Sequence, residues 1–193
     1  VPAHRVVTEA CEGLTGVNAK EVVEATLRDL YDGMAEKELA TAQTMAARAR
    51  IEKEPNYTYV SALLLMDALR HEATRFLEMP ETHPTQQDMV GLYPDYFRAY
   101  IARAVDEELI DPKLGLYDLH KLGEALLPER DMQFDYLGLQ TLYDRYFLHK
   151  NKTRFELPQA FFMRVAMGLA INEIDREARA IEFYQLLSSF DFM

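Results

Sequence analysis

The strongest constraint on the fold is the spacing of apolar residues, which recur at intervals of three and four along almost the whole chain. Strict alternation of apolar and polar residues, the pattern of a half-buried strand, is not sustained anywhere for the length of a strand. The chain has 193 residues and is 49% hydrophobic, which is enough to fill a core. The sequence therefore predicts an all-α fold.

Local signals indicate where individual helices begin. Asn18 is a good N-cap, and the helix that follows it is expected to bury Val22, Thr26 and Leu27 on one face. Proline is tolerated in the first turn of a helix, so a later helix is predicted over 94–108, beginning at a proline.

Composition divides the chain into two helical parts. Residues 1–78 are expected to form the first lobe, and residues 89–193 a second domain. Between them, residues 79–88 hold two prolines, two threonines and two glutamines, which is typical of a linker. The basic, polar stretch near 147–156 is the one place where a short β-hairpin is predicted.

Charge and cysteine content limit the partners and the compartment. The chain has 32 acidic and 21 basic residues, and a net charge of -11 repels phosphate backbones and anionic membranes. Neither nucleic acid nor a membrane is expected as a partner. The single cysteine, Cys11, lies on an apolar helical pattern and has no intramolecular disulfide partner. We interpret it as a core residue and predict a cytoplasmic location.

Motifs for catalysis or metal binding are incomplete. His71 and Glu72 start like the zinc-protease motif, but the second histidine, four residues after the first, is replaced by Arg75. The remaining histidines show no ligand spacing, so no metal site is predicted. Glycines are scattered singly and form no phosphate-binding loop. The sequence therefore predicts neither catalytic residues nor a bound cofactor.

Longer stretches resemble a known family. The runs ERDMQFDYLGLQTLYDRYFL from Glu129, FELPQAFFMRVAMGLA from Phe155 and YQLLSSFDFM from Tyr184 resemble the N-terminal helical connector of the class I ribonucleotide reductase large subunit. Ahead of them, EGLTGVNAKEVVEATLRDLYDG from Glu12 and EPNYTYVSALLLMDALR from Glu54 resemble the four-helix body of an ATP-cone, an allosteric module of many such subunits. Together these runs cover nearly the whole chain.

The resemblance implies a parent enzyme that reduces ribonucleoside diphosphates to deoxyribonucleotides for DNA synthesis. It also implies a small radical-generating subunit as partner, a homo-oligomeric parent, and ATP and dATP as allosteric effectors. In the family the catalytic barrel follows the helical connector, so this region is expected to be regulatory or structural and inactive alone. The alternative is a stand-alone helical protein-interaction module without enzymatic parentage.

The cone-like region departs from the nucleotide-binding pattern at Pro2, which replaces a basic residue, and at three further positions. Glu36 falls near a threonine of ATP-binding cones, Ala40 near a histidine, and His71 at the place of a phosphate-contacting lysine. A carboxylate repels a triphosphate, and histidine supplies less positive charge than lysine at neutral pH. The family's cone also begins with a basic β-hairpin, and this chain starts after that hairpin. We therefore expect a degenerate cone retained for packing or assembly, unless other residues rebuild the pocket once a hairpin is present.

Overall fold

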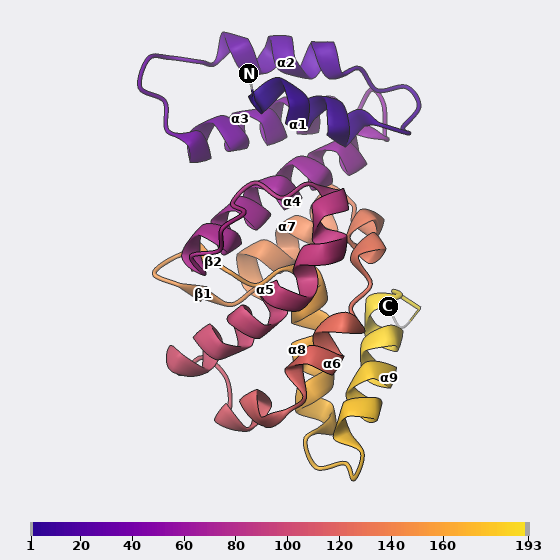
Figure 1. Ribbon diagram of the computed structural model, residues 1–193. Coiled ribbons are helices and arrows are strands. Elements are labelled where there is room, and N and C mark those ends of the chain that lie inside the picture. The colour runs from indigo at the N-terminus through magenta and orange to yellow at the C-terminus, as the bar shows by residue number, and fades with distance from the viewer. Residues whose placement is uncertain (1, 192–193) are drawn as a thin grey trace. The chain divides into compact units, whose positions relative to one another are not determined.

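The computed structural model describes residues 2–191, with side chains from His4 onward, and is helical apart from one short hairpin (Figure 1). The all-α prediction is confirmed. The elements in chain order are α1 (Pro2–Cys11), α2 (Ala19–Arg28), α3 (Glu36–Arg48), α4 (Tyr57–Phe76), α5 (Gln86–Asp106), η1 (Pro112–Leu116), α6 (Leu119–Glu124), η2 (Pro128–Gln133), α7 (Tyr136–Arg145), β1 (His149–Lys150), β2 (Thr153–Arg154), α8 (Pro158–Ala170) and α9 (Arg176–Ser188).

Contacts divide the chain into two compact units. The first comprises the chain up to Leu69 together with Phe134–Tyr146, and the second comprises Arg70–Gln133 and the chain from Phe147 onward. Helix α4 therefore contributes to both units, and α7 belongs to the first although it follows much of the second in sequence. The predicted linker, residues 79–88, lies inside the second unit and includes the first turn of α5.

The first unit contains helices α1 to α3, the part of α4 up to Leu69, and α7. Its core includes Val7 of α1, Val22 of α2, Ala47 of α3 and Val60 of α4, each fully buried. The predicted N-cap, Asn18, accepts a hydrogen bond from the backbone N–H of Lys20 at 3.0 Å through its side chain. The core contacts bury one apolar face of each short helix, and this burial supplies most of the stability of helices of this length.

The predicted buried face of α2 is only partly correct. Val22 and Thr26 are buried, and the Thr26 hydroxyl is satisfied by donating to the Val22 carbonyl at 2.9 Å. Leu27, however, is 57% exposed. Successive residues are about 100° apart around a helix, so the rotation that buries Thr26 carries Leu27 away from the neighbours of α2.

Helix α5 begins earlier than predicted and contains a proline in its interior. Thr85 and Asp88 form a capping box, with the Thr85 hydroxyl accepting from the Asp88 N–H at 3.2 Å and Asp88 Oδ2 accepting from the Thr85 N–H at 2.8 Å. This signal places the start at Gln86, so the predicted start at Pro94 is wrong. Helix α6 packs closely against Pro94. A Cβ added to Gly123 of α6 would lie only 3.1 Å from Pro94 Cα.

The hairpin predicted near 147–156 is confirmed. Strands β1 and β2 pair antiparallel, with His149 opposite Arg154 and Lys150 opposite Thr153. The two turn residues, Asn151 and Lys152, have φ values of 49° and 66°, as a two-residue type I′ turn requires. Beyond the hairpin, α8 and α9 pack side by side (Figure 1). Among the described residues, no helix is long and apolar enough to cross a bilayer.

Candidate functional site

Two of the predicted nucleotide-contact positions lie at the start of α3. Glu36 is exposed in the first turn, and Ala40 follows one turn later and is half-buried. The N-cap, Ala35, has no side-chain oxygen to cap the helix. Instead, Glu38 Oε2 accepts hydrogen bonds from the Ala35 N–H at 3.0 Å and from the Tyr31 hydroxyl at 2.6 Å.

The first turn of α3 carries two carboxylates, Glu36 and Glu38. The Tyr31 hydroxyl and the Ala35 N–H lower the pKa of Glu38, so its carboxyl group is ionised at neutral pH. The same hydrogen bond raises the pKa of Tyr31. A helix N-terminus ordinarily attracts anions, but here two glutamates of the first turn, Glu36 and Glu38, already supply the negative charge.

The third predicted position, His71, lies on the part of α4 that belongs to the second unit. Its Nδ1 is 2.5 Å from the Thr82 carbonyl oxygen, to which Thr74 Oγ1 also donates at 3.3 Å. These contacts hold the segment after α4 against the helix. They also place the ring of His83 on that of His71, with centroids 3.9 Å apart and planes 12° from parallel. Sequence spacing did not reveal this pair, because a chain reversal brings the two histidines together.

The predicted positions are thus distributed over both units. Glu36 and Ala40 belong to the first unit, and His71 belongs to the second. Helix α3 holds the first two one turn apart, and His71 stacks on His83, which is not one of the predicted positions.

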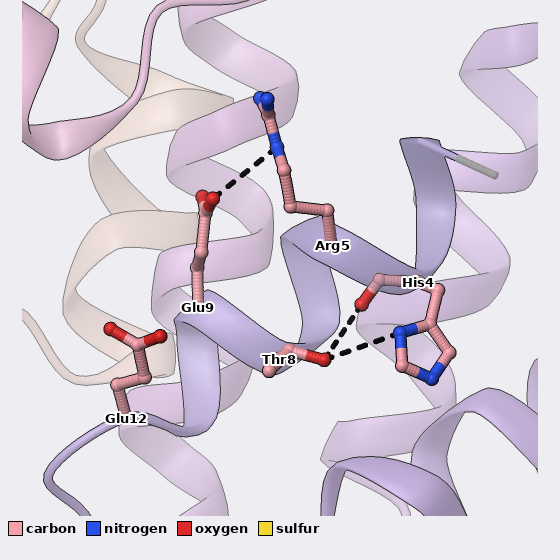
Figure 2. Close-up of a pocket in the computed structure, with 5 residues that line it drawn as sticks. All are labelled: His4, Arg5, Thr8, Glu9 and Glu12. Atoms are coloured by element: carbon pink, nitrogen blue, oxygen red, sulfur yellow. Dashed lines mark hydrogen bonds and ion pairs between the residues drawn. The ribbon is translucent and has the colours of Figure 1, made fainter.

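The outward face of α1 is another group of polar side chains (Figure 2). Arg5 Nε is 3.2 Å from Glu9 Oε1, and the Thr8 hydroxyl donates to the His4 carbonyl at 2.9 Å. Glu12 follows directly after the end of α1, and all five residues are exposed. Exposed pairs of this kind contribute little energy and leave charges solvated. We interpret the face as a solvated helix surface.

A buried polar cluster of the second unit surrounds Asp131, which is 1% exposed. Its carboxylate accepts hydrogen bonds from Arg70 Nη2 at 3.0 Å, the Tyr93 hydroxyl at 2.8 Å and Gln159 Nε2 at 2.8 Å. Gln159 in turn accepts from the Tyr184 hydroxyl at 2.7 Å. Burial raises the pKa of Asp131, while Arg70 and the other donors oppose that shift. The cluster ties η2 to α4, α5, α8 and α9.

A second buried cluster surrounds Glu156, which is fully buried. Arg164 binds it with two nitrogens, at 2.6 and 3.0 Å, and the Tyr100 hydroxyl and the Leu148 N–H also donate to it. Burial raises the pKa of Tyr100 well above its ordinary value, so the phenol stays protonated at neutral pH. Both clusters contain carboxylates whose hydrogen bonds come from protein donors, which is typical of structural networks.

Cys11 is half-buried and packs against the core of the first unit. Burial raises the pKa of its thiol, which disfavours the thiolate that a nucleophile needs. This agrees with the interpretation of Cys11 as a core residue.

Comparison with known proteins identifies relatives that match most of the chain. Residues 132–193 match the model of the ribonucleotide reductase all-α domain. The chain is 43% identical over 175 residues to ribonucleoside-diphosphate reductase subunit alpha of Chlamydia trachomatis, covering 91% of this chain and 16% of the relative. It is 32% identical to the subunit alpha of Helicobacter pylori and 33% identical to that of Enterobacteria phage T4, each over 96% of this chain and over 22% and 24% of the relative.

The fold and the polar clusters define an all-α helical module. The comparisons then give its family, since the all-α domain match is accompanied by a similarity that extends over nine-tenths of the chain. The chain belongs to the ribonucleotide reductase large-subunit family and corresponds to the N-terminal region of its members. It spans about 16% of the length of the chlamydial relatives it matches.

Proposed function

We propose that the chain serves as a non-catalytic regulatory or structural region of a ribonucleoside-diphosphate reductase, the enzyme named in its relatives. The observation that carries this proposal is the 43% identity over 91% of the chain, which extends well beyond the matched all-α domain. The parent enzyme would reduce ribonucleoside diphosphates to deoxyribonucleotides together with a small radical-generating subunit. The buried clusters support a structural role, because their charged groups are enclosed and hydrogen-bonded within the second unit.

A chimeric enzyme tests this function. The matching N-terminal residues of the Chlamydia trachomatis subunit would be replaced by this chain, and reduction of CDP would be measured with the small subunit present. We expect the chimera to form deoxycytidine diphosphate and the 193-residue chain alone to form none. A matched control replaces residues 132–193 of the chimera with an unrelated helical sequence of equal length, which should abolish activity. A folded but inactive chimera would favour the stand-alone interaction module instead.

We further propose that the cone-like region does not bind ATP or dATP. The resemblance assigns nucleotide contact to Glu36, Ala40 and His71, and two features argue against such contact here. The start of α3 carries the carboxylates of Glu36 and Glu38. The Nδ1 of His71 contacts a backbone carbonyl, so that nitrogen is unavailable to a phosphate. On this proposal the region contributes packing or assembly.

Isothermal titration of the chain with ATP and with dATP tests the second proposal. We expect no saturable heat for the chain as it stands. The triple variant Glu36→Thr, Ala40→His, His71→Lys places the family's residue types at the three positions and should bind more tightly than the parent chain. Micromolar binding of either nucleotide by the unchanged chain would overturn this proposal, without affecting the chimera test.

A further inference from the structure

We propose that Asp131 and Glu156 act as a pair of anchors that fix both ends of α7 from the second unit. Helix α7 belongs to the first unit, whereas the residues on both sides of it belong to the second. The two carboxylates are positioning residues, because they act on α7 through the backbone that leads into it and out of it. Such anchors give a change in one unit a route to the other, which goes beyond the proposed function.

The first anchor precedes α7. The chain passes from the second unit to the first between Gln133 and Phe134, and Asp131 is buried shortly before that point. The Asp131 carboxylate accepts hydrogen bonds from Arg70 Nη2 at 3.0 Å and from Gln159 Nε2 at 2.8 Å. Both donors belong to the second unit, so the segment that enters α7 is held there.

The second anchor follows α7. The chain returns to the second unit at Phe147, which is 3% exposed. The N–H of the next residue, Leu148, donates to Glu156 Oε1 at 3.2 Å, and Arg164 binds the same carboxylate with two nitrogens. The segment that leaves α7 is therefore held by a second buried charge of the second unit.

The packing of α7 makes these anchors important. Of its 10 residues only Tyr136 and Leu139 are buried, and Leu137 is 72% exposed. A helix of this length is marginal by itself, so its order depends on tertiary contacts. Fixing both ends of a segment limits the conformational freedom that the segment gains when it opens, which lowers the entropic cost of closing it. Anchored ends therefore stabilise α7 although few of its side chains are buried.

Hydrogen exchange of backbone amides, followed by NMR, tests the anchors in the unchanged chain. Helix α2 is the matched comparison, because it also has 10 residues, belongs to the same unit and buries two residues, Val22 and Thr26. In the described segments on either side of α2, no charged side chain is buried. We expect the amides of α7 to exchange about tenfold more slowly than those of α2. Exchange of α7 as fast as that of α2 overturns the proposal.

Substitutions distinguish anchoring from a general loss of stability. Asp131→Asn and Glu156→Gln keep the shape of each side chain and remove its charge. Each should speed exchange in α7 by about tenfold or more and change exchange in α2 by less than about twofold. The control is Leu122→Ala, at a fully buried position of α6 in the second unit. It should speed exchange in α6 and leave exchange in α7 within about twofold.

The proposal is overturned if neither anchor variant speeds exchange in α7, or if Leu122→Ala speeds it as much as they do. Circular dichroism checks that each variant is folded. If an anchor variant does not fold, the comparison of α7 with α2 in the unchanged chain decides the question.

Discussion

Replacing Asp131 with alanine should destabilise the second unit more than any change to an exposed ion pair. The Asp131 side chain is fully buried, and its partner Arg70 retains only 5% side-chain exposure. Alanine would leave the guanidinium of Arg70 buried without its counter-ion. Tyr93 and Gln159 would also lose the acceptor for their hydrogen bonds.

The size of the effect follows from what remains buried. Breaking a buried ion pair by removing one partner costs about 3–5 kcal/mol, because the other charge stays uncompensated. Each neutral donor left without an acceptor adds about 1–3 kcal/mol, although relaxation and water entry reduce that sum. Since whole domains are stable by only about 5–15 kcal/mol, Asp131→Ala should remove a large part of the stability of this unit.

Urea unfolding followed by circular dichroism measures the loss. The control is Glu182→Ala, which breaks the exposed Arg179–Glu182 pair at 2.8 Å and should change the free energy of unfolding by less than about 1 kcal/mol. Replacing both charges together, with Arg70→Met and Asp131→Leu, should recover only the part of the loss that comes from the uncompensated Arg70 charge, because Tyr93 and Gln159 still lack an acceptor. An Asp131→Ala chain as stable as the Glu182→Ala control would refute the reasoning.

Two further predictions concern glycines and acid sensitivity. Gly168→Ala on α8 should raise the free energy of unfolding by about 0.5–1 kcal/mol, because the added Cβ meets nothing within 4 Å. Gly123→Ala should lower it by about 1–3 kcal/mol, because the added Cβ meets the Pro94 backbone. Thermal unfolding that gives the reverse order of stability would contradict both predictions. Tyr31→Phe should raise the pKa of Glu38, measured by NMR titration. Folding lowers the pKa of Glu38, so the stabilisation by its ionised form is present above the unfolded pKa of about 4.3 and is lost as the pH falls through the folded pKa. The variant, with a higher folded pKa, should lose this stabilisation at a higher pH than the parent chain. An unchanged Glu38 titration would show that Tyr31 does not set the pKa of Glu38.

Local signals in the sequence were sufficient to predict the helical class, the N-cap at Asn18 and the hairpin near 147–156. These features depend on neighbouring residues, which a pattern search detects. The start of α5 predicted at Pro94 is wrong, because the capping box of Thr85 and Asp88 begins the helix at Gln86. Proline is usual in a first turn, but here its ring lies in the interior of a helix that was already capped.

The close contact of His71 with His83 could not be predicted in the same way. The two residues are separated by a helix end and a reversal, so neither helical nor strand spacing relates them. The signal that could have suggested it is the composition of residues 79–88, since a polar segment directly after a helix can turn back along that helix. The composition predicted a linker, but it did not predict the direction in which the chain would turn.

The buried charges were missed for a different reason, and their geometry makes a specific demand on the sequence. Arg70 and Asp131 are far apart in the chain, and each resembles an ordinary surface residue in its local sequence. Exchanging them should not restore stability, because Tyr93 and Gln159 donate hydrogen bonds to the position of Asp131. An arginine there would face two donors and have no acceptor for its own N–H groups. The network therefore requires an ion pair and also fixes which position holds the carboxylate and which the guanidinium. A sequence pattern that records only polarity gives neither piece of information.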